Sequence, residues 1–194
     1  MNLIEATRYC FRNALNFKGR AARYEFWNFV LFIILVDIVL TIINILIFGP
    51  TVTEGFQVSI DSNGNQTSGL IIEQDYNSGW FGTVFGLVVL LPFVAVSVRR
   101  LHDRGRSAWF LLIPAVGLAI AIGLVSLNLT TAPIDTTGLP ADFPTQMPVP
   151  QNATFLIAAF LIALGSCVAP IVWFARASQP GPNRFGPNPH EVLQ

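Results

Sequence analysis

All 11 lysine and arginine residues of this 194-residue chain fall in three stretches, which long apolar segments separate from two stretches that contain none. Only 11% of the residues are charged and 53% are hydrophobic, whereas soluble domains contain roughly 25% charged residues. This sorting of charge predicts a multi-pass membrane protein without a separate soluble catalytic domain. The basic residues are Arg8, Arg12, Lys18, Arg20 and Arg23; Arg99, Arg100, Arg104 and Arg106; and Arg176 and Arg184.

Four apolar stretches are long enough to cross a bilayer as helices. A helix needs about 20 mostly apolar residues to span a hydrocarbon core roughly 30 Å thick. The four stretches cover residues 27–48, 80–98, 108–129 and 155–175. We therefore expect a single integral membrane domain over residues 1–194, folded as an all-α four-helix transmembrane bundle.

The basic residues also predict the orientation of the chain. Lysine and arginine concentrate in cytoplasmic segments of membrane proteins. Both termini and the middle loop are therefore expected in the cytoplasm, and the two other loops on the opposite side. The cytoplasmic segments are then 1–26, 99–107 and 176–194, and the extracytoplasmic segments are 49–79 and 130–154.

Residues 3–17 form an amphipathic helix on a helical wheel, with Ala6 and Cys10 on the apolar side and Arg8 and Arg12 on the polar side. Such a helix can lie in the membrane interface, where its arginines meet anionic headgroups. Packing on the cytoplasmic loops of the protein itself explains the same pattern equally well.

The two extracytoplasmic loops differ in their residue patterns. In the first, Phe56, Val58 and Ile60 alternate with polar residues, turn-forming residues follow at 61–65, and residues 70–72 can return as a second strand. This pattern predicts a small extracytoplasmic β-hairpin. The second loop contains five prolines and is predicted to be irregular.

Asp37 lies within the first span, about 15 Å deep at the helical rise per residue. Thr41 and Asn44 follow on the same helical face. An ionisable group at this depth marks a candidate functional site. Three interpretations fit: a hydrogen bond to another helix, with Ser166 as the candidate partner; a proton or ion relay; and a contact between subunits.

Pro92, Pro114 and Pro170 all lie in the cytoplasmic third of their spans. Proline removes a helical hydrogen bond and kinks the helix. Kinks at one depth predict helices that separate toward the cytoplasm around a shallow vestibule.

The middle loop concentrates basic residues next to a helix start. Gly105 can form a turn, and Ser107 can cap the third span. Arginines beside helix N-terminal amides suit phosphate or a lipid headgroup. Simple anchoring by arginines that reach toward the headgroups is the alternative. The candidate anion-binding residues are Arg20, Arg23, Arg99, Arg100, Arg104 and Arg106.

His102 beside Asp103 invites a general-base role, but neither a nucleophile nor a second histidine accompanies this pair in the sequence. We therefore expect no catalytic residue, metal site or cofactor. Cys10 and Cys167 should lie at different depths and are expected to be free thiols.

Three motifs occur in order along the chain. Residues 17–27 read Phe-x-Gly-Arg-x-x-Arg-x-Glu-Phe-Trp, residues 99–109 read Arg-Arg-Leu-His-Asp-x-Gly-x-Ser-x-Trp, and residues 181–186 read Gly-x-Asn-Arg-Phe-Gly, with Asn188 and Pro189 after them. Together they resemble the domain-of-unknown-function 805 family of small bacterial inner-membrane proteins. The resemblance implies a location in the bacterial inner (plasma) membrane and no established activity. The outer loops are longer than the resemblance implies, and Asn188 stands where an acid is expected.

The motifs all map to the predicted cytoplasmic face, where they can form an ionic network. Glu25 can pair with an arginine of the second motif, and Asp103 with Arg20 or Arg23. His102, Asn183 and Arg184 can complete the set. Partly buried networks of this kind fix the register between helix ends and a tail.

These patterns favour a non-enzymatic membrane module whose arginine-rich cytoplasmic face binds membrane lipids with anionic headgroups, a protein partner or a second copy of the chain. Nucleic acid is not an expected partner. One rival is a small transporter or channel that uses Asp37. The other is a membrane enzyme that acts on a phosphorylated or lipid substrate.

Overall fold

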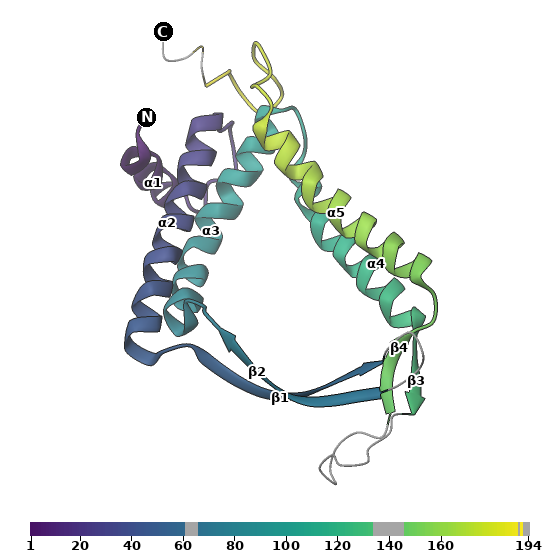
Figure 1. The fold of residues 1–194 in the computed structure, drawn as a ribbon. Coiled ribbons are helices and arrows are strands. Elements are labelled where there is room, and N and C mark those ends of the chain that lie inside the picture. Colours follow the sequence, from purple (N-terminus) through teal and green to yellow (C-terminus); the bar gives the residue numbers. More distant parts are fainter. Residues whose placement is uncertain (61–65, 134–145, 190, 192–194) are drawn as a thin grey trace.

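Long apolar helices dominate the computed structural model, which describes residues 1–60, 66–133, 146–189 and 191 (Figure 1). Five α-helices, one 3₁₀ helix and two strand pairs follow one another among these residues. The helices are α1 (Leu3–Arg12), α2 (Arg23–Phe48), α3 (Gly79–Asp103), η1 (Ala108–Leu112), α4 (Ile113–Asn128) and α5 (Ala153–Ala175). The strands are β1 (Thr51–Ile60), β2 (Gln66–Asp75), β3 (Leu129–Pro133) and β4 (Gln146–Pro150).

Four helical segments among the described residues are long and apolar enough to cross a membrane: α2, α3, η1 with α4, and α5. The predicted all-α membrane fold is therefore confirmed. The boundaries differ at one end of the molecule, because α2 starts at Arg23 and α3 continues to Asp103. The arginines expected in the middle loop thus include two, Arg99 and Arg100, that stand on the last turns of a helix.

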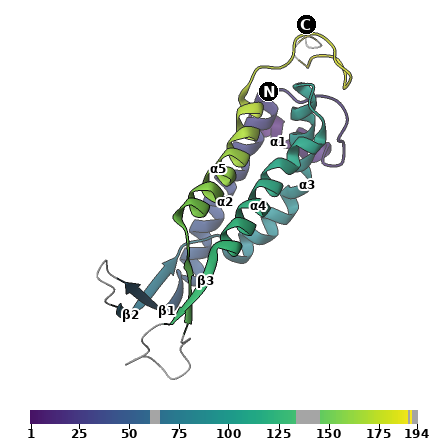
Figure 2. The same ribbon diagram turned by 90° about the vertical axis from the view of Figure 1, so that its right-hand side faces the viewer.

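The long helices form two hairpins, α2–α3 and α4–α5, that run between the same two ends of the molecule (Figures 1 and 2). We call the end that carries Arg20, Arg99 and Arg100 the arginine end, and the end that carries the strands the strand end. The two hairpins meet at the arginine end and diverge toward the strand end (Figure 1).

The expected vestibule on the arginine side is therefore wrong, because the helices are closest together there. The rings of Phe26 and Phe174 lie 4.5 Å apart and those of Phe26 and Phe93 lie 6.1 Å apart, which closes that end with a packed aromatic cluster. Pro114 stands in the first turn of α4, where a proline costs no hydrogen bond. The positions of the prolines thus do not show at which end of the molecule the helices pack most closely.

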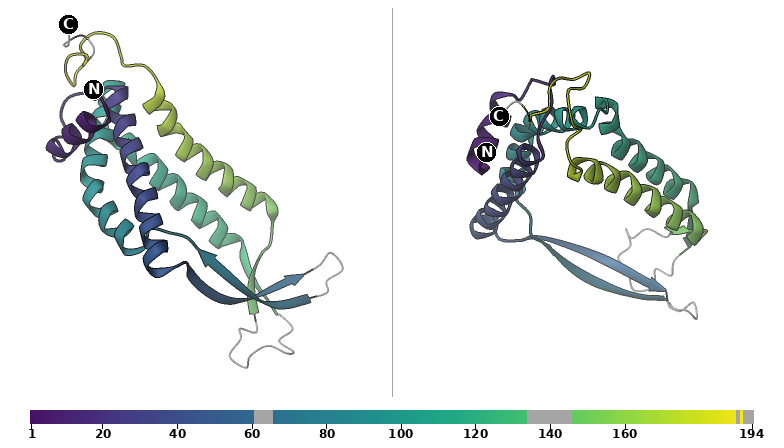
Figure 3. Two further views of the ribbon diagram at one scale, coloured as in Figure 1. Left: turned by 60° about the vertical axis from the view of Figure 1, so that its left-hand side comes forward. Right: turned by 90° about the horizontal axis from the view of Figure 1, so that it is seen from above.

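The helix α1 lies across α2 at the arginine end (Figures 1 and 3). Asn2 caps it by accepting a hydrogen bond from the Glu5 amide at 2.9 Å. Ala6 and Cys10 are fully buried, so the apolar side of α1 packs against the other helices of the chain. Burial raises the pKa of the Cys10 thiol to about 12.

The strand pair β1–β2 confirms the predicted β-hairpin. The two strands are antiparallel, with Thr51 opposite Asp75 and Ile60 opposite Gln66. This ribbon extends from the α2–α3 hairpin toward the α4–α5 hairpin (Figures 1 and 3). The turn expected at 61–65 lies outside the described residues.

The loop between α4 and α5 was predicted to be irregular, and this is wrong for its two ends, which pair as β3 and β4. The amide of Gln151 donates to the Asn128 carbonyl at 2.9 Å, and this pair continues the ladder. Hydrogen-bonded and non-hydrogen-bonded pairs alternate in antiparallel ladders. Pro133, Pro148 and Pro150 all fall in the non-hydrogen-bonded pairs, so the strands lose no ladder bond to proline.

Candidate functional site

Asp103 is the centre of a buried ionic network at the arginine end. Its Oδ1 accepts a hydrogen bond from Arg20 Nε at 3.0 Å, and its Oδ2 accepts one from Arg100 NH1. The side chains of all three residues are at most 1% exposed. Of the two partners expected for Asp103, Arg20 makes the contact and Arg23 does not.

Arg100 ties the end of α5 to the end of α3. Its Nε and NH2 donate to the Phe174 carbonyl at 3.1 and 2.9 Å, and NH2 also donates to the Arg176 carbonyl. The last carbonyls of a helix lack intrahelical partners and carry partial negative charge. The Arg100 guanidinium satisfies these carbonyls, and its NH1 reaches the Ala21 carbonyl at 3.3 Å as well.

Arg20 holds the C-terminal tail in place from the opposite direction. Its NH2 donates to the Gln179 carbonyl at 2.5 Å, and its NH1 donates to the Gly181 carbonyl at 2.7 Å and to the Gly186 carbonyl at 3.4 Å. The Gly181 amide in turn donates to the Glu191 carboxylate at 3.0 Å, which lowers the pKa of that carboxylate. Through Arg20 and Arg100, Asp103 therefore anchors the described part of the tail to the end of α3.

Glu25 and Arg99 form a second buried ion pair, with Glu25 Oε1 and Arg99 NH2 3.0 Å apart. The Arg99 guanidinium carbon lies 5.4 Å from the centre of the Tyr9 ring. The 3.0 Å contact is an ion pair without hydrogen-bond geometry, so Glu25 Oε1 and Arg99 Nε and NH2 make no hydrogen bond to a described residue. Buried polar atoms in this state are rare and require an explanation.

His102 and Asp103 contact different neighbours, although they are adjacent in the sequence. The His102 ring stacks on Phe185 with centroids 3.8 Å apart and planes 4° from parallel, and its Nδ1 lies 3.3 Å from the Gly19 carbonyl. Asn183 donates to the His102 carbonyl at 2.9 Å. His102 thus joins the loop before α2 to the tail.

The remaining candidate arginines lie around this network and are less enclosed. Arg23 is exposed and reaches the Ala175 carbonyl at 3.5 Å. Arg104 donates to the Ala177 carbonyl. Arg184 is exposed and lies 3.5 Å from the Gly105 carbonyl.

Arg106 is held differently, between two aromatic rings. Its guanidinium carbon lies 4.3 Å from the centre of the Trp173 ring and 4.8 Å from that of Phe110. These cation–π contacts join η1 to α5. Gly105 makes the expected turn with a φ of 68°. Ser107 precedes η1 but makes no side-chain cap, so that part of the expectation is wrong.

The polar residues of α2 lie toward the strand end, away from the network. Asn44 is buried and donates to the Asn77 carbonyl at 3.1 Å, next to the N-terminus of α3. Asp37 is exposed, and its Oδ1 would lie 3.4 Å from a Cβ at Gly82. Thr41, which lies between these two residues in the sequence, is half-buried.

The hydrogen bond expected between Asp37 and Ser166 is wrong. Ser166 donates to the Ala163 carbonyl at 2.8 Å within α5. It also packs against α4, since a Cβ on Gly117 would lie 2.2 Å from the Ser166 Cβ. The two residues therefore belong to different hairpins.

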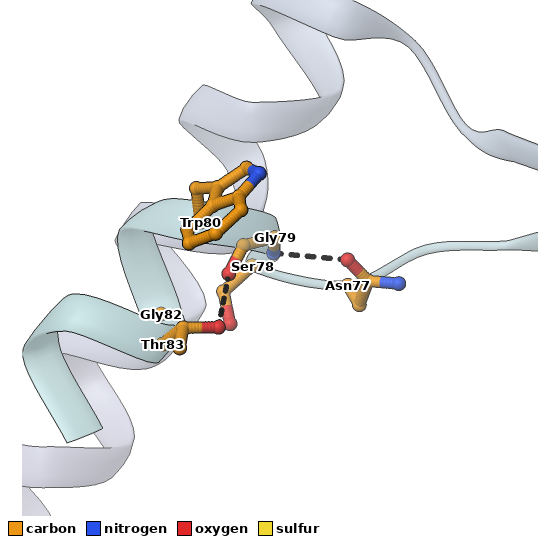
Figure 4. Close-up of a pocket in the computed structure, with 6 residues that line it drawn as sticks. All are labelled: Asn77, Ser78, Gly79, Trp80, Gly82 and Thr83. Atoms are coloured by element: carbon orange, nitrogen blue, oxygen red, sulfur yellow. Dashed lines mark hydrogen bonds between the residues drawn. The ribbon is translucent and has the colours of Figure 1, made fainter. Parts of the chain in front are cut away.

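A cavity of about 600 Å³ lies beside the N-terminus of α3, as Figure 4 shows. Asn77 Oδ1 accepts from the Gly79 amide at 2.9 Å, and the Thr83 hydroxyl donates to the Gly79 carbonyl at 3.1 Å (Figure 4). The side chains here satisfy the first turn of the helix itself.

Several partners in the network could not be found from sequence patterns, because they are backbone carbonyls. Those of Phe174, Gln179 and Gly181 accept from buried arginines, and any residue type can supply them. The stacking residue Phe185 had a signal, since it stands in the third motif. Tyr9 had none, since on the helical wheel it lies among the polar residues of α1.

The chain is similar in sequence to one family and to several inner membrane proteins. The family model described as "Protein of unknown function (DUF805)" matches residues 14–187. Inner membrane protein YhaH of Escherichia coli (strain K12) is 34% identical over 114 residues, which cover 57% of this chain and 75% of that protein. Inner membrane protein YhaI of the same strain is 29% identical over 114 residues, which cover 57% and 74%. No solved structure matches significantly.

The matched residues 14–187 contain the four helical segments that, in the described part of the chain, can cross a membrane. They also contain Arg20, Glu25, Arg99, Arg100 and Asp103 of the buried network. The relatives are named only as inner membrane proteins. From the motifs, the helices and the match together, this chain belongs to the DUF805 family of inner membrane proteins, whose function is unknown.

Proposed function

We propose that this protein is a non-enzymatic membrane module whose arginine end lies on the cytoplasmic side and binds anionic phospholipid headgroups. The exposed basic side chains at this end support the proposal most directly. They outnumber the exposed carboxylates described there, Glu5 and Glu191. The exposed basic residues are Arg8, Arg12, Lys18, Arg23, Arg176 and Arg184.

This set differs from the anion-binding residues expected from the sequence. Arg20, Arg99 and Arg100 are buried, and Arg20 and Arg100 donate to Asp103 and to backbone carbonyls. Their role in the proposal is indirect: they hold the tail and the helix ends in one arrangement. A surface ordered in advance loses less entropy when it binds a ligand.

Apolar side chains at the same end suit the interfacial region of a bilayer. Trp109 is 76% exposed and Leu15 is 74% exposed. Tryptophan is enriched where the hydrocarbon core meets the headgroups. The helix α1 presents Arg8 and Arg12 on its exposed side while its apolar side packs on the chain. Exposed aromatic and basic residues therefore lie together, as in proteins that contact anionic lipid surfaces.

The test is the lipid preference of the purified protein after the exposed charge of α1 and the next loop is removed. The variant is Arg8→Gln, Arg12→Gln and Lys18→Gln together. Each basic residue near an anionic surface contributes about 1 kcal/mol to binding, which corresponds to a change in affinity of up to roughly fivefold. This contribution decreases as the salt concentration rises. Native mass spectrometry should show that wild type retains phosphatidylglycerol over phosphatidylcholine and that the variant loses most of this preference.

A matched control removes three carboxylates at the strand end, with Glu54→Gln, Glu73→Gln and Asp75→Asn. This control should keep the lipid preference of wild type. An unchanged preference in the arginine-end variant, or an equal loss in the control, would contradict the proposal.

The other readings remain predictions. Transport requires ion or proton flux in vesicles that Asp37→Asn abolishes. A membrane enzyme requires turnover that His102→Ala abolishes. A protein partner or second copy at the same face requires an association that the Arg8, Arg12 and Lys18 variant weakens and that added phosphatidylglycerol does not replace.

A further inference from the structure

A second feature of the arginine end is a pocket of about 410 Å³ between α1, the start of α2 and the tail. Its walls come from segments far apart in the sequence, including Tyr9 of α1, Glu25 of α2 and Phe185 of the tail. The volume lies within the range of small-molecule sites, roughly 300–1,000 Å³. Five of its eleven lining residues are aromatic or proline, and two, Arg20 and Glu25, are charged.

Of the two charged residues in the pocket wall, Arg20 is bonded to Asp103 and to tail carbonyls, whereas Glu25 belongs to the incompletely bonded ion pair. Glu25 is 6% exposed and lines the pocket, and Arg99 stands behind it at 2% exposure. Glu25 Oε1 and Arg99 NH2 lie 3.0 Å apart without hydrogen-bond geometry, and Arg99 Nε makes no hydrogen bond to a described residue. Removing such a pair from water is costly unless hydrogen bonds complete it. A ligand that completes the pair must offer a donor and an acceptor close together.

The charge of the buried cluster indicates which end of the ligand meets which residue. Arg20, Arg99 and Arg100 carry three positive charges, whereas Glu25 and Asp103 carry two negative charges. The excess positive charge favours an anionic group near the guanidinium of Arg99. The carboxylate of Glu25, beside the rings of Tyr9 and Tyr24, favours a cation.

We infer that this pocket binds the headgroup of an aminophospholipid, with the phosphate toward Arg99 and the primary ammonium toward Glu25. The zwitterionic headgroup matches the Glu25–Arg99 pair charge for charge and supplies the hydrogen bonds that the pair lacks. Tyr9 lines the pocket, is 44% exposed and has its ring centre 5.4 Å from the Arg99 guanidinium carbon. The inference rests on the proposed function only in placing this end among headgroups, and it does not need the exposed arginines.

The test compares two lipids with the same zwitterionic charge. The primary ammonium of phosphatidylethanolamine has three N–H donors, whereas the quaternary ammonium of phosphatidylcholine has no N–H donor. The full-length protein is purified with equal amounts of both lipids and studied by native mass spectrometry. We expect one phosphatidylethanolamine per chain, retained about tenfold or more over phosphatidylcholine, since hydrogen bonds to charged groups give preferences of this order. Equal retention of the two lipids would overturn the inference.

Two variants locate the preference in this pocket. The double variant Glu25→Gln/Arg99→Gln removes both charges of the pair together and leaves neither unpaired, and it should lower the ethanolamine preference to near one. Tyr9→Leu removes an exposed ring, and it should reduce the preference several-fold even if the double variant does not fold. Glu5→Gln, which neutralises a carboxylate on α1 outside the pocket, is the control and should behave as wild type. A preference that survives Tyr9→Leu unchanged would overturn the inference.

Soluble phosphoethanolamine separates the two sources of this chemistry. Displacement of the lipid by the soluble compound would show that the headgroup alone is recognised, and no displacement would show that the acyl-bearing lipid is required; both support the pocket. The Arg8, Arg12 and Lys18 variant should keep its ethanolamine preference while it loses its phosphatidylglycerol preference, so each proposal can fail without the other.

Discussion

Replacing Asp103 with alanine removes the carboxylate that two buried arginines share. Arg20 Nε lies 3.0 Å from Asp103 Oδ1, and Arg100 NH1 donates to Oδ2. All three side chains are at most 1% exposed, so the substitution leaves two buried guanidinium groups without the anion that they share. We expect the free energy of unfolding to fall substantially.

Two routes give the size of this loss. Each hydrogen bond to a charged group contributes roughly 1.5–3 kcal/mol, and Asp103 accepts two. Removing one partner of a buried ion pair costs about 3–5 kcal/mol. Arg20 and Arg100 keep their contacts with backbone carbonyls, so the ion-pair value applies. We therefore expect the free energy of unfolding to fall by about 3–5 kcal/mol. Asp103→Asn keeps one oxygen acceptor and should cost about half as much.

Denaturant unfolding of the detergent-solubilised protein measures this effect. The matched control is Glu54→Ala, which removes an exposed carboxylate at the strand end and should cost less than about 0.5 kcal/mol. A loss for Asp103→Ala no larger than that of the control would refute the reasoning. Limited proteolysis should also cleave the tail of the Asp103→Ala protein before the helices, because the tail carbonyls bind the two arginines that Asp103 holds.

Three further changes test separate contacts. Arg106→Ala removes the guanidinium that lies 4.3 Å from the Trp173 ring centre, and should destabilise the protein by about 1 kcal/mol in thermal unfolding, with Arg106→Lys less harmful; no shift would contradict the contact. Gly117→Ala places a Cβ 2.2 Å from that of Ser166 and should cost about 1–3 kcal/mol, and Ser166→Gly should restore most of it. Cys10, whose pKa burial raises to about 12, should stay mostly protonated at pH 8 and should resist maleimide until the protein unfolds; rapid labelling of folded protein would contradict this.

The helices could be predicted from the sequence because each span is a continuous apolar stretch with few competing signals. The β1–β2 hairpin had an equally local pattern, the alternation of apolar and polar residues on either side of turn-forming residues. The β3–β4 pair was missed because prolines normally indicate irregular chain. A proline disrupts an antiparallel ladder only where it stands in a hydrogen-bonded pair. The register that pairs Leu129 with Pro150 decides this, and it is known only from the structure.

The arginine network was only partly predictable, for a related reason. The sequence places acidic and basic residues at one end of the helices, and that is enough to expect pairs such as Arg20 with Asp103. It does not separate an arginine that is buried, such as Arg100, from one that is exposed, such as Arg23. Both reach a carbonyl at the end of α5, and the difference depends on how closely the helix ends and the tail enclose each guanidinium, which is a property of tertiary packing.

The side of the membrane on which the arginine end lies tests the account most directly. Single cysteines at Thr53 of β1 and at Arg184 of the tail, both exposed, are introduced with Cys10 and Cys167 changed to serine. A membrane-impermeant maleimide is then added to spheroplasts. The account predicts labelling of Thr53→Cys in intact spheroplasts and of Arg184→Cys only after permeabilisation. Labelling of Arg184→Cys in intact spheroplasts, with Thr53→Cys protected, would contradict it.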